Sequence, residues 1–236
     1  MSTLGVSGTW HRFITVGNPD SRFAYPNLVR NFVHYGGHEA PLPDPRMYVV
    51  VDVETSGLYP DRGDRVIEIA AHRTSGDGKI VESWSSLVNP MNGEVGLTEL
   101  HGISPEMVGS APTFAQVLPE FISFLGDAVF VAHHAVFDAS FIDAEARRAG
   151  VQIPLLPGLC TYWLSRTVMH DMAKHKLGML AEKFGVTNSL EHSASADASV
   201  VVEILPHLLE RTDPIRHYVA PMPRQEPLVR IATVTR

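Results

Sequence analysis

The chain has 236 residues, enough for one sizeable domain with extensions or at most two small ones. It is 44% hydrophobic and 19% charged, as globular proteins are, and its single cysteine excludes an internal disulfide and is typical of a reducing compartment. It shows neither an apolar run of roughly 18 residues nor the pattern of a signal peptide, so we expect a cytoplasmic protein without a membrane partner.

The charge distribution excludes one kind of nucleic-acid binding. The net charge is −7, and residues 46–211 hold 12 Lys and Arg against 21 Asp and Glu. A protein that coats nucleic acid non-specifically would be basic. An acidic site for divalent cations stays compatible with this charge, because bound metal reverses the local sign.

Residues 1–45 form an N-terminal extension of unknown role, whose aromatic residues suggest that it packs on the domain as a cap. The stretch PNLVRNFVHY, Pro26–Tyr35, predicts a short helix that ends at Gly36–Gly37. A Pro-rich linker, APLPDPR, then leads into the first clear strand.

Three strands follow with short turns between them, over Tyr48–Glu54, Arg65–Arg73 and Lys79–Leu87. This spacing predicts an antiparallel meander. A loop with a short helix follows, in the stretch LTELHGIS.

The second half alternates helices with one short buried strand, Ala128–Ala132. The expected helices are Thr113–Leu125 with Thr113 as its N-cap, Phe137–Ala149, Thr161–His170, Leu177–Phe184 and Ala194–Glu210. The order predicts an α/β domain over residues 46–211, with a mixed sheet of antiparallel meander and parallel strands flanked by helices. Its prolines predict a flexible C-terminal tail over residues 212–236.

Two acids at the end of the first strand raise the question of function. Strand side chains alternate, so Asp52 and Glu54 point to one face while Val53 points to the other. Strand ends are where α/β folds tend to place ligands. The bland alternative is an exposed strand end with two solvated acids.

Two further clusters carry similar chemistry. Asp138 follows the buried strand in HHAVFDASF, and His192 precedes Asp197 in HSASAD, near the start of the last helix. Taken alone, Asp138 is better explained as a helix-capping residue, and His192 as a surface histidine. Together the clusters bring four carboxylates and one histidine to the ends of apolar elements.

Carboxylates without cysteine suit Mg²⁺ or Mn²⁺ and not a structural zinc ion. Four of them exceed what one Mg²⁺ normally takes. Two divalent ions about 4 Å apart would use them better, which is the arrangement for in-line phosphodiester hydrolysis. A histidine that titrates near neutrality suits the base that removes a proton from the attacking water.

The motifs DVETSG, HHAVFD and HSASAD, in this order, closely resemble those of the DEDDh family of 3′–5′ exonucleases. This DnaQ-like group includes the epsilon subunit of bacterial DNA polymerase III and ribonuclease T. The resemblance covers about residues 46–210, with LTELHGIS similar to the family's nucleotide-contacting loop. It implies a ribonuclease H-like fold.

The resemblance also implies roles for individual residues. Asp52 would bridge both metal ions, Glu54 and Asp197 would complete the ion that activates water, and Asp138 would hold the second ion. His192 would be the general base. The residues implied to hold the terminal nucleotide are Thr55 through its main chain, and Leu58, His101 and Phe137 through their side chains.

Some positions depart from the family or add to it. His134 stands where the family usually has Asn, and Cys160 stands where many members have Asp; we expect a buried apolar role for the cysteine. Lys174–Lys176 is a small basic cluster, read either as a solvated helix start or as a contact for phosphates. The tail segment Gln225–Ile231, QEPLVRI, faintly resembles a sliding-clamp-binding peptide.

The leading hypothesis from the sequence is a metal-dependent 3′–5′ exonuclease that acts on single-stranded or frayed DNA or RNA ends and releases nucleoside 5′-monophosphates, in DNA proofreading or repair. An RNA-trimming exonuclease is the alternative within the enzyme class. A non-catalytic, exonuclease-like module in a polymerase assembly is the alternative outside it. A DNA polymerase or sliding clamp would then be the protein partner.

Overall fold

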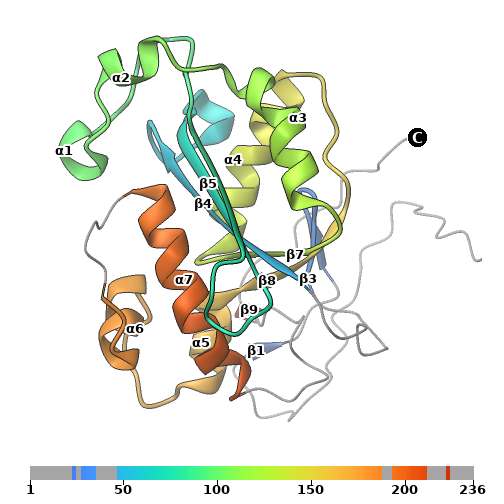
Figure 1. Ribbon diagram of the computed structural model, residues 1–236, viewed down its shortest axis with the longest axis vertical. Coiled ribbons are helices and arrows are strands. Elements are labelled where there is room, and N and C mark those ends of the chain that lie inside the picture. Colours follow the sequence, from blue (N-terminus) through green and yellow to red (C-terminus); the bar gives the residue numbers. More distant parts are fainter. Residues whose placement is uncertain (1–22, 25–27, 36–46, 188–192, 212–221, 224–236) are drawn as a thin grey trace, which may run out of the picture.

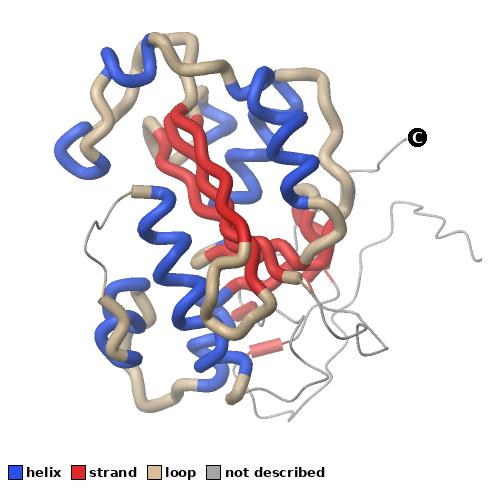
Figure 2. Tube along the Cα trace, in the orientation of Figure 1, coloured by secondary structure: helices blue, strands red, loops and turns tan. Residues whose placement is uncertain are grey.

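A computed structural model describes residues 23–24, 28–35, 47–187, 193–211 and 222–223. The core is a seven-stranded mixed sheet in the order β2-β3-β8-β7-β4-β5-β6, with helices on both faces (Figures 1 and 2). The strands are β2 (Leu28–Arg30), β3 (Val33–Tyr35), β4 (Tyr48–Thr55), β5 (Val66–Thr74), β6 (Glu82–Leu87), β7 (Val129–Ala132) and β8 (Leu156–Cys160). The helices are η1 (Pro60–Arg62), α1 (Thr98–His101), α2 (Pro105–Gly109), α3 (Phe114–Leu125), α4 (Ala135–Arg148), α5 (Thr161–Val168), α6 (Leu177–Phe184) and α7 (Ala194–Leu209).

The predicted meander is confirmed. Strands β4, β5 and β6 pair antiparallel, while β7 pairs parallel with β4, and β8 pairs parallel with β7. The carboxyl ends of β4, β7 and β8 therefore lie at one edge of the sheet, where loops and helix starts converge. The sheet thus has the mixed character expected of an α/β, ribonuclease H-like domain.

Alternation along β4 divides the core into two layers. Val49, Val51 and Val53 pack on the face covered by α3 and α4. Tyr48 and Val50 pack on the opposite face, with α5, α6 and α7. Asp52 continues the second series, so the acids at the end of β4 face α7.

The helix predicted over Pro26–Tyr35 is wrong. The described part of this stretch is a hairpin, in which β2 and β3 pair antiparallel around a two-residue turn at Asn31–Phe32. Asn31 adopts a left-handed backbone (φ 56°), which asparagine tolerates better than most residues and which short hairpin turns require. Strand β3 then pairs parallel with β8, so the N-terminal extension supplies two strands to the sheet.

Strand β8 and the short helix α2 were not predicted, whereas the other main elements match within a few residues. Thr113 is the N-cap of α3, as expected, and the Gln116 side chain accepts the Thr113 backbone N–H at 2.8 Å. Of the tail, only β9 (Met222–Pro223) is described, paired with β1 (Phe23–Ala24). The clamp-like segment Gln225–Ile231 lies outside the described residues. Among those described, no helix has the length and apolar composition to cross a bilayer.

Candidate metal and catalytic site

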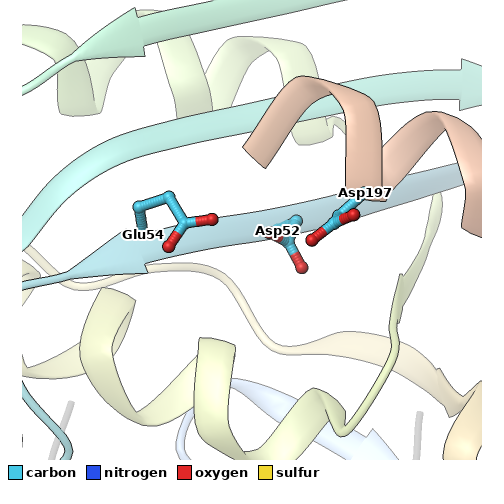
Figure 3. Close-up of side chains that lie close together, drawn as sticks. All are labelled: Asp52, Glu54 and Asp197. Atoms are coloured by element: carbon cyan, nitrogen blue, oxygen red, sulfur yellow. The ribbon is translucent and has the colours of Figure 1, made fainter. Parts of the chain in front are cut away.

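Three of the predicted acids converge at the edge of the sheet. Asp52 and Glu54 lie at the end of β4, and Asp197 lies in the first turn of α7, which packs on the same face (Figure 3). Each offers a carboxylate oxygen, and these oxygens all lie within 4.8 Å of one another. Ligands around Mg²⁺ at about 2.1 Å lie roughly 3 to 4 Å apart, so this donor set fits a hard divalent cation.

Asp138, the fourth predicted acid, lies outside this group of three but acts on it through its charge, which raises the pKa of Asp52. It lies in the first turn of α4 and is buried, with 3% of its surface exposed. Burial raises its pKa to about 8, although backbone N–H groups of Asp138 and Val53 hydrogen-bond to the carboxylate and oppose the shift. The negative charge of Glu54 raises the pKa of Asp138 further. The hydrogen bond from the Val53 N–H to Asp138 links the start of α4 to β4, on the face of the sheet that α3 and α4 cover.

The charges of the acids repel one another. Burial raises the pKa of Asp52 well above its usual value, and Asp138, Asp197 and Glu54 raise it further. Burial and the charge of Asp197 raise the pKa of Glu54 to about 7. Each of these negative charges raises the pKa of its neighbours, and a divalent cation would offset all of them at once.

A fifth carboxylate, Glu68, was missed by the sequence reasoning. It lies on β5 directly across from Glu54, and its charge raises the pKa values of both Asp52 and Glu54. Its own pKa is raised by burial, while its hydrogen bond from the Ala194 backbone N–H (3.0 Å) opposes the shift. The signal in the sequence was an acid within the apolar run VIEIAA, on the strand paired with the first motif.

Residues of β5 also hold the start of α7, and with it Asp197. Glu68 accepts the Ala194 N–H, and the ring of His72 contacts the carbonyl oxygen of the next residue, Ser195 (2.9 Å), and, one helical turn further, Ser199 Oγ (3.1 Å). His72 is buried, with 4% of its surface exposed. These contacts fix the first turn of α7 over the face that carries Asp52.

His192, the predicted general base, lies outside the described residues. Its role stays a prediction from the sequence pattern. The described chain resumes at Ser193, the N-cap of α7, so His192 immediately precedes the turn that carries Asp197.

The residues expected to hold the terminal nucleotide lie at the end of β4, in the loop that follows it, on α1 and on α4. Thr55 ends β4 and donates its hydroxyl to the Gly57 carbonyl oxygen at 2.6 Å, and Leu58 is 67% exposed. Phe137 is half-buried on α4, against Phe141. His101 ends α1 with both ring nitrogens engaged: Nε2 lies 3.0 Å from the Val95 carbonyl oxygen, and Nδ1 accepts the Ile103 N–H.

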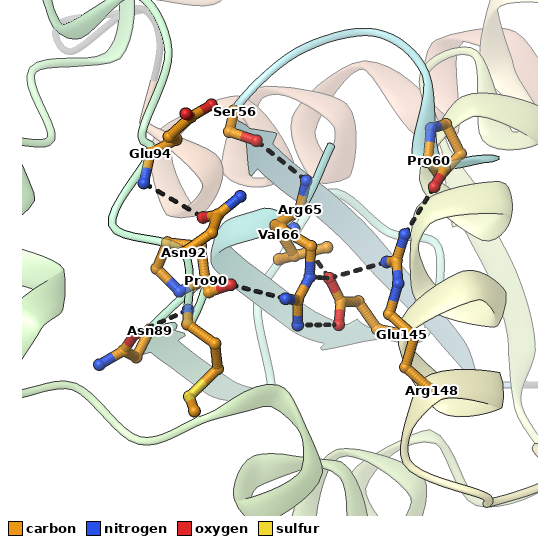
Figure 4. A network of polar contacts seen from close by, with 11 residues as sticks. Ser56, Pro60, Arg65, Val66, Asn89, Pro90, Asn92, Glu94, Glu145 and Arg148 are labelled. Carbon is orange, nitrogen blue, oxygen red and sulfur yellow. Dashed lines mark hydrogen bonds and ion pairs between the residues drawn. The ribbon is translucent and has the colours of Figure 1, made fainter. Parts of the chain in front are cut away.

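A network behind the site fixes the loops that follow β4 and β6 (Figure 4). Arg65 forms a two-pronged ion pair with the buried Glu145 at 2.6 and 2.8 Å and also donates to the Pro90 carbonyl oxygen. Arg148 joins Glu145 to the Pro60 carbonyl oxygen. A Cβ at Gly96 would lie 2.4 Å from the Ser56 carbonyl oxygen, so a glycine is needed where these loops meet.

His134 and Cys160, which depart from the resembled family, have local explanations. His134 is the N-cap of α4 in a left-handed backbone (φ 74°), a conformation in which asparagine and histidine are both enriched. Cys160 is buried, as expected, and burial raises the pKa of its thiol to about 11. The thiol therefore stays protonated at neutral pH.

Known proteins resemble this chain in sequence. A family model described as an exonuclease, RNase_T, matches residues 49–205. A DNA polymerase III PolC-type of Clostridium perfringens is 39% identical over 170 residues, which are 72% of this chain and 11% of the relative. The 3′-5′ exonuclease DinG of Bacillus subtilis is 38% identical over 165 residues, which are 70% of this chain and 18% of the relative. The chain thus spans less than a fifth of each of these two relatives.

Solved structures share the fold. Exonuclease X, in complex with 5′ overhanging duplex DNA, superimposes with a TM-score of 0.56 and 25% identity over 70% of this chain and 92% of that one. The nuclease domain of 3′hExo, described as a DEDDh family member bound to rAMP, gives a TM-score of 0.61 at 17% identity over 71% of this chain and 93% of that one. At 17% identity, the likeness to 3′hExo shows a shared fold alone.

Proposed function

Since the chain belongs to the DEDDh, DnaQ-like exonuclease family, we propose that this 3′–5′ exonuclease hydrolyses single-stranded or frayed DNA ends in proofreading or repair and releases nucleoside 5′-monophosphates. The observation that carries the proposal is the convergence of Asp52, Glu54 and Asp197 within 4.8 Å, with the buried Asp138 coupled to them. The catalytic unit in this proposal is residues 46–211, and the family match over residues 49–205 supports it.

The four acids would hold two divalent ions, Mg²⁺ or Mn²⁺. When bound, such ions lower the pKa of an attacking water and stabilise the leaving oxygen. Asp52 and Glu54 supply ligands from a rigid strand, and Asp138 and Asp197 supply them from the first turns of two helices. Because all four positions are fixed by packed elements, little reorganisation is needed when a substrate phosphate enters.

The protein's own groups perform the remaining tasks in this proposal. His192 takes the proton of the attacking water as general base. Leu58, Phe137 and the ring of His101 pack on the sugar and base of the 3′-terminal nucleotide, and the main chain near Thr55 binds its polar groups. This grip does not depend on base identity, which suits unpaired ends.

Two observations support DNA as the substrate. The relatives at 36–39% identity include several named DNA polymerase III PolC-type, and the matched Exonuclease X structure is a DNA complex. A DNA polymerase is therefore the partner in this proposal. A sliding clamp has only the pattern of Gln225–Ile231 in its favour.

The test is degradation of end-labelled single-stranded DNA and RNA of matched sequence. We expect the parent to digest DNA faster than RNA when Mg²⁺ or Mn²⁺ is present, and to lose activity in EDTA. Asp52→Ala should lower the rate at least about a hundredfold while leaving the fold intact, because a carboxylate that orients charge at the reacting phosphate is gone. The matched control is Asp127→Ala, at an exposed acid in the turn before β7.

Three outcomes would overturn parts of the proposal. An Asp52→Ala variant as fast as the parent would remove these acids from the mechanism. Faster digestion of RNA would replace proofreading with RNA trimming. No turnover of either substrate, together with no saturable Mn²⁺ binding by calorimetry, would identify a non-catalytic module.

A further inference from the structure

A basic segment beside the acidic cluster is left without a role by the proposed chemistry. Lys174 and Lys176 flank His175 just before α6, and both lysines are exposed. Neither forms an ion pair with any described residue. By contrast, carboxylates pair with the following described cations: Arg65, Arg73, Arg147, Arg148 and Lys183.

The segment is anchored next to the end of β4. β7 pairs parallel with β4, with Val50 opposite Val131, and His133 follows β7 directly, at the edge of the sheet where β4 carries Asp52. The His133 Nε2 lies 3.0 Å from the His175 carbonyl oxygen. The segment with Lys174 and Lys176 is therefore tied to the end of β7, the strand next to β4.

His133, which holds the lysine segment through the His175 carbonyl oxygen, stays in one protonation state. Burial lowers the pKa of His133 to about 4, so its ring is neutral at neutral pH. Because the His175 carbonyl oxygen can only accept, Nε2 carries the proton, and Nδ1 accepts from the Thr161 hydroxyl at 3.1 Å. His175 is buried in turn, with its Nδ1 3.1 Å from Ser165 Oγ.

A third cation lies close by. Arg166, on α5, is near enough to His175 to lower the pKa of that imidazole, and its guanidinium lies 4.8 Å from the ring centroid of Trp163. Asp171, an acid whose charge acts on His175, forms an ion pair with Lys183 at 2.8 Å. Lys174, Lys176 and Arg166 thus bring three cationic side chains to the surroundings of His175, in a domain whose net charge is negative.

On the basis of the proposed function, we propose that Lys174 and Lys176 bind backbone phosphates of the nucleic-acid strand upstream of the scissile bond. The strand is a polyanion, and five carboxylates around the scissile phosphate repel its neighbouring phosphates. Metal ions offset that repulsion only at the reacting centre. Exposed cations fixed beside the site supply the next contacts without reading the base sequence.

The test compares substrate lengths in the full chain. The double variant Lys174→Ala/Lys176→Ala should lower the ratio of kcat/KM for a long oligothymidylate to that for dithymidylate by about tenfold at low salt, since only the long strand reaches the lysines. The slope of log KM against log salt for the long strand should become less steep by about 1.4, at about 0.7 for each lost phosphate contact on a single strand.

The controls separate charge from structure. Lys174→Arg/Lys176→Arg keeps both charges and should retain the parental ratio and slope. Lys79→Ala removes an exposed lysine at the opposite end of the sheet, between β5 and β6, and should retain them as well. Thermal unfolding confirms that each variant is folded.

The outcomes distinguish this inference from the proposed function. A parent that hydrolyses both substrates, alongside an alanine double variant with the parental ratio and salt slope, would overturn the lysine contacts only. A parent that hydrolyses neither substrate with Mg²⁺ or Mn²⁺ would overturn the exonuclease assignment, and the lysine inference with it.

Discussion

The carboxylate of Asp138 lies in a buried environment that disfavours its charged form. Its pKa rises to about 8 through burial, so the folded, metal-free protein binds a proton here that the unfolded chain releases near its ordinary pKa of 3.8. A raised folded pKa means that this group's contribution to stability is complete below about pH 4 and is lost as the pH rises through about 8.

The raised pKa of Asp138 in the folded protein predicts the effect of Asp138→Asn. The amide keeps an acceptor for the Val53 N–H but cannot ionise. In EDTA at about pH 9, we expect this variant to unfold at a higher temperature than the parent, by the equivalent of several kcal/mol, with the difference shrinking toward about pH 4. A melting-temperature series against pH measures it. A variant that is less stable than the parent across the whole range would contradict the expectation.

The residues of the site were predictable to the extent that each motif carried its own pattern. Alternation in β4 was enough to place Asp52 and Glu54 on one face, and helix starts indicated Asp138 and Asp197. Glu68 was not predicted, because it lies within an apolar strand. Only its pairing with Glu54 on the neighbouring strand indicates that it belongs near the site. Pairing between strands is a tertiary property that residue patterns alone do not specify.

At the level of elements, the N-terminal hairpin makes part of the extension a component of the sheet. Phe32, in its turn, is 3% exposed and packs edge-on against Phe130 of β7, with ring centroids 5.3 Å apart. Its carbonyl oxygen accepts the Leu156 N–H at the start of β8. The hairpin thus covers the edge of the sheet next to β8.

We therefore expect Phe32→Ala to destabilise the protein by about 3–5 kcal/mol, because truncation of a buried aromatic leaves a cavity. Phe32→Leu should cost less, since most of the volume remains. Urea unfolding measures both changes, and Mn²⁺ affinity should stay parental because β8 and β7 lie between the hairpin and β4, which carries Asp52 and Glu54. Equal stability of the alanine variant and the parent would show that the extension does not pack here.

The sequence predicted helix where this hairpin lies because LVRNFVHY contains apolar residues at helical as well as strand spacing. The turn at Asn31 and the partner strand β8 decided the outcome. Strand β8 was itself missed, since LPGLC contains a proline and a glycine that weaken any strand pattern. By contrast, α3, α6 and α7 carried long patterns with clear boundaries and were predicted to within a residue or two.

For the whole molecule, the buried Glu145 joins parts that are far apart in the chain. Its carboxylate accepts hydrogen bonds from Arg65, Arg148 and the Val66 N–H, and these residues reach the loops around Pro60 and Pro90. The side chain of Glu145 is 1% exposed. Removal of one partner from such a buried pair leaves a cation without its counter-charge.

Glu145→Ala should therefore lower the free energy of unfolding by about 3–5 kcal/mol. Glu82→Ala is the matched control, because it breaks the more exposed pair with Arg73 and should cost at most about 1 kcal/mol. Chemical denaturation of both variants gives the comparison. Similar costs for the two would argue that Glu145 contributes no more than a surface ion pair.

The acids that compose the site enter the chain far apart: two from the first central strand, one from α4 and one from the last long helix. In the proposed two-ion site, a nascent chain that has emerged from the ribosome only as far as α6 lacks Asp197 and so holds an incomplete set of ligands. We therefore expect nuclease activity to arise during synthesis only after α7 has docked, and fragments cut short before it to be harmless to the nucleic acid around them.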